Sequence, residues 1–276
     1  MIRAAVLGSP ISHSLSPQLH KIAYEILGIQ AEYSRFDVKS GGLPDFLIEH
    51  PELDALSLTM PLKEEALLIA DSVSQISLQI QSGNTLSKKD GIWNLTSTDV
   101  EGFIQALKVN NFSSDGTALI IGSGATARAC VAALASVDRK QKGKIHVIHR
   151  NPDREKQMRA AAPLIDLEFH IWDSFPIIND TSLVVNTTPA GIADAFCDFV
   201  DKPRGLYFEA LYNPWPTLLF DRWESQGAGR IDGIDLLVHQ AISQVEIFTG
   251  ISVDRKSLSS HMRLKALELL DQSTGK

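Results

Sequence analysis

The chain has 276 residues, of which 44% are hydrophobic and 21% are charged, a globular composition with enough length for one large or two smaller domains. Its net charge of −7 comes without a long basic run, which argues against nucleic acid as the main partner. No run of about 18 apolar residues occurs, so we expect neither a membrane-spanning helix nor a membrane partner. Cys130 and Cys197 lie far apart and outside any CxxC pattern, and the short apolar N-terminus is unlike a signal peptide, so we expect a cytoplasmic protein.

Short apolar runs alternate with amphipathic helical patterns along most of the chain. Such alternation is typical of βαβ units on a mostly parallel sheet, and it predicts an α/β fold. The exception is Asn84–Thr96, where two short runs flank Asp90–Gly91, a hairpin turn signal. The predicted strands are Arg3–Leu7, Glu32–Asp37, Ala55–Thr59, Thr85–Lys88, Ile92–Leu95, Ala118–Ile121, Ile145–His149, Leu183–Asn186 and Leu206–Glu209.

The first helix is predicted to start within GSPISHSLSPQLHK, where Ser16 would be the N-cap and Pro17 the first helical residue. Gly28 should end this helix. Leu19 stands where a capping box would need Glu or Gln, so free amides at this end could accept an anion. The hydroxyls of Ser14 and Ser16 could therefore form a carboxylate cradle, or they could only satisfy a structural turn.

A glycine-rich turn in ALIIGSGATARACVAAL is the clearest local motif. An apolar strand leads into Gly122 and Gly124, followed by an alanine-rich helix, which is the G-x-G-x-x-A form of a dinucleotide-binding turn. Gly122 would permit the tight turn, and Gly124 would let the backbone approach a pyrophosphate at the helix N-terminus. The alternative is a structural turn with small residues for packing.

The residues after the next strand bear on which nucleotide is bound. An NAD site would carry Asp or Glu there, but this chain has His149, Arg150 and Asn151, with Arg154 shortly after. A guanidinium can pair with a ribose 2′-phosphate, which a carboxylate would repel. This pattern predicts NADP, unless Arg150 and Arg154 are ordinary surface cations. His13 and His20 lie seven residues apart, and no carboxylate or cysteine cluster accompanies them. We therefore predict no metal site from these histidines.

Several blocks together resemble the shikimate dehydrogenase family, in the family's order and over nearly the whole chain. The N-terminal block GSPISHSLSPQLH resembles that family's signature. The segments SLTMP, YNPWPT and QVEIFTG are most similar in sequence to its actinobacterial branch. The other matching blocks are LTMPLKE (Leu58–Glu64), GNTL (Gly83–Leu86), STDVEG (Ser97–Gly102), GSGATARA, NTTPAG (Asn186–Gly191), LYNPWPTLL (Leu211–Leu219) and DGIDLLVHQAISQVEIFTG (Asp232–Gly250).

This resemblance implies an NADP-dependent oxidoreductase that reduces 3-dehydroshikimate to shikimate, on the route to chorismate and the aromatic amino acids. By the same likeness Lys63 and Asp99 would be the catalytic pair and would also contact substrate. The remaining substrate-binding residues would be Ser14, Ser16, Thr59, Asn84, Tyr212 and Gln240. The cofactor-binding residues would be Gly122, Gly124, Ala125, Arg150, Arg154, Thr187 and Gly233.

The family fold has two lobes with an active-site cleft between them. The resemblance implies a substrate-binding α/β domain at residues 1–100 plus 235–276 and a Rossmann-type NADP-binding domain at 101–234. The sequence leaves a homodimer open.

Each implied role also has a structural reading. Lys63 begins a charged turn, Asp99 could cap the next helix, Gln240 could be a surface residue beside an apolar stripe, and Tyr212 could pack in a proline-rich loop. The chain departs from the family's commoner residues at Ser57, Ser97, Glu209, Leu236 and in the loop Ile192–Pro203. These departures leave open a relative that acts on quinate or an amino analogue of shikimate. A protein that senses NADP without turnover is the alternative from another class, against which Lys63 and Asp99 argue.

Overall fold

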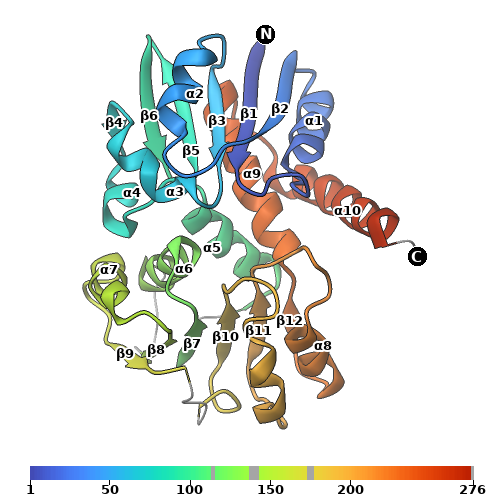
Figure 1. Cartoon of the computed structure of the whole chain (residues 1–276). Helices are drawn as coiled ribbons and strands as arrows, with labels where there is room; N and C mark the ends of the chain where they lie inside the picture. Colours follow the sequence, from blue (N-terminus) through green and yellow to red (C-terminus); the bar gives the residue numbers. More distant parts are fainter. Residues whose placement is uncertain (113–115, 137–142, 173–176, 275–276) are drawn as a thin grey trace. The chain divides into compact units, whose positions relative to one another are not determined.

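The structure is a computed structural model, and it describes residues 1–112, 116–136, 143–172 and 177–274. The chain divides into two compact units (Figure 1). The first unit comprises Met1–Gly102 and Leu237–Lys276, and the second comprises Phe103–Leu236. Both junctions lie two residues after the boundaries at 100 and 235 that the family resemblance implies.

The first unit contains a mixed sheet in the order β2-β1-β3-β5-β6-β4. Its parallel part consists of β1 (Ile2–Gly8), β2 (Ala31–Asp37) and β3 (Ala55–Leu58). The hairpin β5 (Thr85–Lys89) and β6 (Ile92–Thr96) continues it antiparallel, and β4 (Ser72–Val73) lies parallel to β6. Asp90 and Gly91 both have positive φ, as the hairpin signal predicts.

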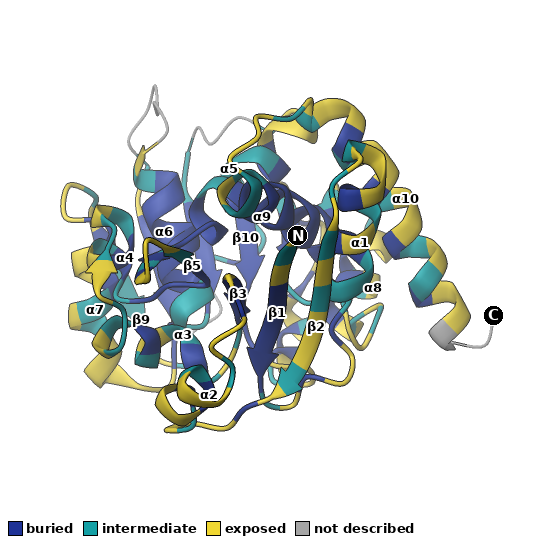
Figure 2. Ribbon diagram, turned by 90° about the horizontal axis from the view of Figure 1, so that it is seen from above, coloured by how far each residue is buried: buried dark blue, intermediate teal, exposed yellow. Residues whose placement is uncertain are grey.

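Side chains of the inner strands alternate between the two faces of the sheet. Leu56 and Leu58 of β3 belong to a buried cluster with residues of α2 (Leu43–Glu49), whereas Ser57 between them bonds to Gln244 of α9 (Gly233–Thr249). Figure 2 shows β1 and β3 mostly in the colour of buried residues. The helical elements here are α1 (Ser16–Leu27), α2 (Leu43–Glu49), α3 (Leu62–Glu65), η1 (Ala66–Leu68), α4 (Gln75–Ile80) and α10 (Arg255–Thr274).

Two helices run from one unit into the other. They are α5 (Asp99–Val109) and α9 (Gly233–Thr249), which contain the two junctions between the units. The helical pattern at Glu101–Lys108 is confirmed by α5. The chain therefore crosses between the units in helical backbone both times.

The second unit contains a parallel sheet in the order β12-β11-β10-β7-β8-β9. Numbered from β7, this is the Rossmann order 3-2-1-4-5-6, in which the chain reverses direction across the sheet between β7 and β10. Its strands are β7 (Ala118–Ile121), β8 (Ile145–Ile148), β9 (Leu167–His170), β10 (Leu183–Asn186), β11 (Leu206–Glu209) and β12 (Arg230–Ile231). Its remaining helical elements are α6 (Ala125–Ser136), η2 (Pro152–Arg154), α7 (Glu155–Ala161), η3 (Asp194–Phe199) and α8 (Leu218–Ser225).

The apolar strands of the second unit explain its core. Leu119, Ile121, Ile148 and Val184 pack against Phe196 of η3 and residues of α8. The loop Ile192–Pro203 therefore contributes a core side chain despite its departure from the family's commoner residues. No helix within the described residues is both long and apolar enough to cross a bilayer.

Candidate functional site

Lys63 and Asp99 form an ion pair in the first unit. The Lys63 Nζ atom lies 2.6 Å from Asp99 Oδ2, and the two side chains are only 16% and 8% exposed. Lys63 belongs to the short helix α3 after β3, and Asp99 is the first residue of α5 after β6. An ion pair so little exposed is screened less than a surface pair and has a defined geometry. The readings of Lys63 as a solvated surface lysine and of Asp99 as only a helix cap do not fit this contact.

Asn84 is the centre of the hydrogen bonds around that pair. Its Nδ2 group lies 2.9 Å from Asp99 Oδ1, 2.9 Å from Thr98 Oγ1 and 3.2 Å from Gln240 Oε1. Its Oδ1 atom accepts hydrogen bonds from the Thr98 amide at 2.8 Å and the Thr85 hydroxyl at 2.8 Å. Since Asn84 is buried, these bonds satisfy its amide and hold the Asp99 carboxylate from the side opposite Lys63.

Gln240 is buried on α9, so the reading of this residue as a surface glutamine is wrong. Its Nε2 donates to the Leu237 carbonyl at 2.9 Å, and its Oε1 faces Asn84. Gly102 makes this possible, because a Cβ at that position would lie 3.0 Å from the Gln240 main-chain nitrogen. The absence of a side chain lets α5 approach α9 closely at the site.

Ser14 and Ser16 lie buried at the start of α1, but their helix-capping roles differ from the prediction. Leu15 occupies the N-cap position, and Ser16 is the first helical residue. The Ser16 amide donates to Ser14 Oγ at 3.3 Å. The prediction of Ser16 as N-cap is therefore wrong, because the turn places the hydroxyl that serves this helix end two residues earlier.

Thr59 follows β3, in the loop that leads to Lys63. Its amide donates to the Leu7 carbonyl at 2.9 Å, and the Ser9 amide donates to the Met60 carbonyl at 2.9 Å. The loops after β1 and β3 are thus hydrogen-bonded at the carboxyl ends of neighbouring parallel strands. Side chains at this edge of an α/β sheet commonly bind ligands.

A buried polar chain beside the site was missed by the sequence analysis. Gln244 accepts a hydrogen bond from Ser57 Oγ at 2.8 Å and donates to the Asn84 carbonyl at 3.1 Å. Tyr33 donates to Ser57 Oγ at 2.6 Å, and His20 Nε2 lies 3.2 Å from Gln244 Oε1. Burial lowers the pKa of His20 from 6.5 to about 3, so its imidazole is neutral at neutral pH. The polar spacing of α9 was the available signal, since Gln240 and Gln244 lie one turn apart.

The glycine turn of the second unit lies where the strand order reverses. Gly122 follows β7 with φ of 111°, and Thr187 follows the neighbouring strand β10. The Thr187 hydroxyl donates to the Ile121 carbonyl at 2.9 Å, and a Cβ on Gly122 would lie 2.5 Å from the Thr187 hydroxyl oxygen. Gly122 thus requires both the positive φ and the missing side chain. In doubly wound sheets this reversal point is where nucleotides bind.

The arginines predicted for the nucleotide lie beside this turn or after β8. Gly124 precedes Ala125, the first residue of α6, and a Cβ on Gly124 would have Arg154 Nη1 as its nearest neighbour at 3.8 Å. Arg150 is exposed, and its guanidinium carbon lies 5.4 Å from the Trp172 ring centroid. Asn151, between these arginines, is the N-cap of η2, where its side-chain oxygen accepts a hydrogen bond from the Asp153 amide at 3.0 Å. Arg154 and Arg150 thus remain the candidates for binding phosphate.

The loop that carries Tyr212 is anchored by Glu209. The carboxylate of Glu209 accepts hydrogen bonds from Tyr207, Asn186, Thr217 and the Leu211 amide. Burial raises the pKa of Glu209. Glu209 stands where the family more often has Asp. Its longer carboxylate still accepts hydrogen bonds from all four of these donors.

Gly233, at the start of α9, packs against the same loop. A Cβ there would lie 2.4 Å from the Leu211 carbonyl oxygen. Close backbone packing within the second unit is therefore enough to require glycine at this position.

Comparison with known proteins decides the family. The profile of the shikimate dehydrogenase substrate binding domain matches residues 6–86. A protein named shikimate dehydrogenase (NADP(+)) from Microcystis aeruginosa is 30% identical over 273 residues, covering 92% of this chain and 94% of the relative. The chain belongs to the shikimate dehydrogenase family.

Solved structures of shikimate dehydrogenases agree. The Mycobacterium tuberculosis enzyme matches with a TM-score of 0.85 and 33% identity, covering 98% of this chain and 100% of that one. The Thermus thermophilus enzyme, solved in complex with NADP(H) and shikimate, matches with a TM-score of 0.83 and 28% identity, covering 96% and 100%. The family's two-domain α/β fold with a Rossmann-type NADP domain is therefore confirmed for this chain.

Proposed function

We propose that this chain is an NADP-dependent shikimate dehydrogenase, which interconverts 3-dehydroshikimate and shikimate on the route to chorismate and the aromatic amino acids. The single observation that carries the proposal is the Lys63–Asp99 pair at 2.6 Å, held by Asn84 in a chain of this family. The first unit binds substrate and the second binds NADP.

Reduction of a ketone requires a proton for the oxygen as well as a hydride for the carbon. The ammonium group of Lys63 donates a hydrogen bond to the carbonyl oxygen and stabilises negative charge as it develops there. Asp99 holds the ammonium group in place through the hydrogen bond at 2.6 Å. The proton for the ketone oxygen comes from this ion pair.

Hydroxyl and amide side chains suit the remaining polar groups of the substrate. Ser14 and Ser16 bind the carboxylate at the start of α1, where the helix dipole favours an anion. Thr59, Asn84 and Gln240 bind ring hydroxyls, because an amide can donate and accept at once. Tyr212 contacts the substrate from its loop after β11.

The second unit has the features that NADP needs. NADPH supplies the hydride when bound. Gly122, Gly124 and Ala125 receive its pyrophosphate at the N-terminus of α6, and Thr187 and Gly233 lie towards the nicotinamide end. Arg150 and Arg154 pair with the 2′-phosphate, which supports a preference for NADP over NAD.

The proposed enzyme works in a reducing cytoplasm on a small molecule and needs no nucleic acid or membrane. The free thiols support this compartment, since Cys130 and Cys197 form no disulfide. Within the first unit, Lys63, Asp99, Asn84 and Gln240 all come from one chain, so their hydrogen bonds require no second copy.

The test is absorbance of the reduced nicotinamide with shikimate or quinate and with NADP or NAD, in all four combinations. Shikimate with NADP should give the fastest reaction. Activity with quinate and NAD but none with shikimate and NADP would overturn the proposal. No turnover in any combination, with NADP still raising the melting temperature, would favour a nucleotide-sensing protein instead.

A further inference from the structure

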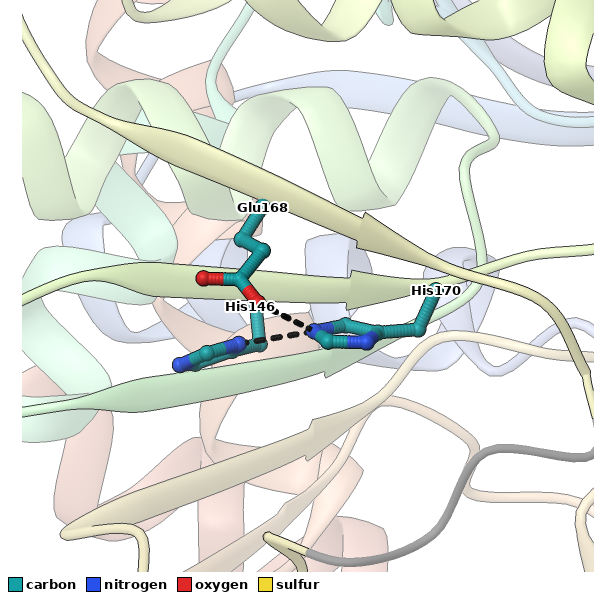
Figure 3. A group of neighbouring side chains, drawn as sticks. All are labelled: His146, Glu168 and His170. Atoms are coloured by element: carbon teal, nitrogen blue, oxygen red, sulfur yellow. Dashed lines mark hydrogen bonds and ion pairs between the residues drawn. The ribbon is translucent and has the colours of Figure 1, made fainter.

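Two histidines and a glutamate meet at the open edge of the second sheet. His146 lies on β8, and Glu168 and His170 lie on the neighbouring edge strand β9. The register pairs His146 with Glu168, and His170 follows two residues later on the same face. Figure 3 shows the three side chains directed towards one another.

The possible ligand atoms are close enough to share one ion. His146 Nδ1 lies 2.8 Å from His170 Nε2, and His170 Nε2 lies 3.8 Å from Glu168 Oε1. One ligand atom from each residue can be chosen so that all lie within 4.8 Å of one another. Ligand atoms of a tetrahedral zinc ion, each about 2.0–2.1 Å from the metal, lie roughly 3.3–3.4 Å apart. Small side-chain rotations would therefore bring the three atoms to that spacing.

We propose that His146, Glu168 and His170 bind a divalent cation of the zinc class, with water as the fourth ligand. Two imidazole nitrogens and one carboxylate oxygen form a donor set suited to Zn²⁺, whereas Mg²⁺ and Ca²⁺ prefer oxygen ligands alone. The site does not depend on the proposed dehydrogenase function.

Burial and neighbouring charge fit a cation site open to solvent on one side. His146 is 9% exposed and the His170 side chain 18%, whereas the Glu168 side chain is 44% exposed and leaves the ion a path. Lys144 Nζ lies 2.9 Å from Glu168 Oε2, so it holds one carboxylate oxygen while the other faces His170. Such a contact orients a ligating carboxylate, as outer groups do in metal sites.

A change of tautomer lets the histidine pair accept a cation. In the hydrogen bond between the rings, one nitrogen carries a proton and the other accepts it. A tautomer change in the donating ring moves that proton to its other nitrogen and frees both facing nitrogens for the metal. The cation then replaces the proton as the link between β8 and the edge strand β9.

The sequence analysis predicted no metal site from His13 and His20, and it did not consider these three residues, which form no recognised metal-binding motif in the sequence. Glu168 and His170 are adjacent on one strand face, but His146 reaches them only through the pairing of β8 with β9. The site is therefore a property of the sheet register.

The experiment uses the untagged full-length protein, treated with a chelator and then desalted. Zn²⁺ and Mg²⁺ are titrated separately by calorimetry, and Co²⁺ is followed by its visible absorption, which intensifies in four-coordinate sites. The wild type should bind one Zn²⁺ per chain, show the Co²⁺ bands and melt at a higher temperature with Zn²⁺. Mg²⁺ should give no comparable signal.

Zn²⁺ binding by single variants tests whether these three residues are the ligands. His170→Ala and Glu168→Gln should each weaken Zn²⁺ binding by at least about 10- to 100-fold, the loss seen even for supporting groups. His261→Ala, which removes an exposed histidine of α10, should bind as the wild type does. Failure of the wild type to bind Zn²⁺, or unchanged binding in both folded site variants, would overturn the proposal. Glu168→Gln changes a partly exposed side chain and keeps the test valid if His170→Ala does not fold.

Discussion

The Lys63 carbonyl accepts a hydrogen bond from the Gly83 amide at 2.8 Å, so the residue before Asn84 holds the main chain of Lys63. Asn84 in turn bonds to Asp99, the partner of the Lys63 ammonium group. One loop thus positions the main chain of Lys63 and, through Asp99, its side chain. This arrangement keeps both members of the proposed catalytic pair in place before any ligand binds.

Lys63→Ala should lower kcat by about 10²–10⁴-fold, the usual cost of losing a proton donor. NADP affinity should change little, because Lys63 belongs to the first unit and the proposed nucleotide residues to the second. Steady-state kinetics and an NADP titration measure the two effects, with Lys89→Ala, an exposed lysine of β5, as the control. A near-normal kcat would show that Lys63 has no catalytic role.

Asn84→Ala should reduce both stability and kcat. It leaves the buried Thr98 amide without its acceptor, which typically costs about 1–3 kcal/mol in the free energy of unfolding. It also frees the Asp99 carboxylate on the side away from Lys63. Urea unfolding and kinetics under native conditions separate the two losses. A variant that unfolds earlier but turns over at the wild-type rate would show that Asn84 is only structural.

Gly122→Ala should destabilise the second unit by about 1–3 kcal/mol, the cost of a strained backbone position, and should weaken NADP binding. The added Cβ would clash with the Thr187 hydroxyl as well as strain the backbone. Gly91→Ala is a matched control, since Gly91 also has positive φ but has no neighbour within 4 Å of the added atom. Chemical unfolding measures the stability of both variants, and an NADP titration measures their affinity. Equal losses in Gly122→Ala and Gly91→Ala would show that the contact between the added Cβ and Thr187 has no effect.

Arg150→Ala should weaken NADP binding by about 10- to 100-fold, which corresponds to the loss of charge-assisted hydrogen bonds. NAD binding should change little, because NAD has no 2′-phosphate. Calorimetry with both nucleotides measures the difference, and Arg263→Ala on α10 of the first unit serves as the control. Equal losses for the two nucleotides would mean that Arg150 does not bind the 2′-phosphate.

The free energy of unfolding should fall as the pH falls below about 6.5. The unfolded chain protonates His20 near its ordinary pKa of 6.5, whereas the folded chain holds that pKa at about 3 through burial. Between these values the unfolded state binds more protons, so each such group can contribute up to about 1.4 kcal/mol per pH unit. Burial lowers the pKa of His239 to about 4, which adds a slope of the same sign.

His20→Phe keeps an aromatic ring beside Tyr33 and removes the titrating group. Urea unfolding between pH 7.5 and 5 should give a shallower slope in this variant than in the wild type, whatever its absolute stability. An unchanged slope in His20→Phe would contradict the assignment.

Local signals predicted most of the fold. The strands at Ala118–Ile121, Leu183–Asn186 and Leu206–Glu209 have the predicted limits, because continuous apolar runs beside small or turn-forming residues define buried parallel strands. The short strands β4, β9 and β12 were not predicted, since each lies at a sheet edge. Such strands alternate weakly or contain too few residues to show a pattern.

The candidate site was predicted less evenly. The motifs located Lys63, Asp99 and Asn84, but only the folded chain shows that Asn84 bonds to Thr98, Asp99 and Gln240. His20 and Gln244 were missed as a pair because their partners come from distant parts of the chain. Ser16 was misplaced as a cap because sequence alone does not distinguish which of two nearby serines faces the first helical amide.

The two helices that carry the chain from one unit to the other limit how such enzymes can be recombined. A fragment cut at either junction would end inside α5 or α9 and would expose hydrogen-bonding groups that the intact helix satisfies. A chimera that borrows the nucleotide unit of a relative should therefore take whole helices, with Gly102 and Gln240 coming from the same parent. Inheritance of this close pair as one block would preserve the interhelical fit on which the active centre depends.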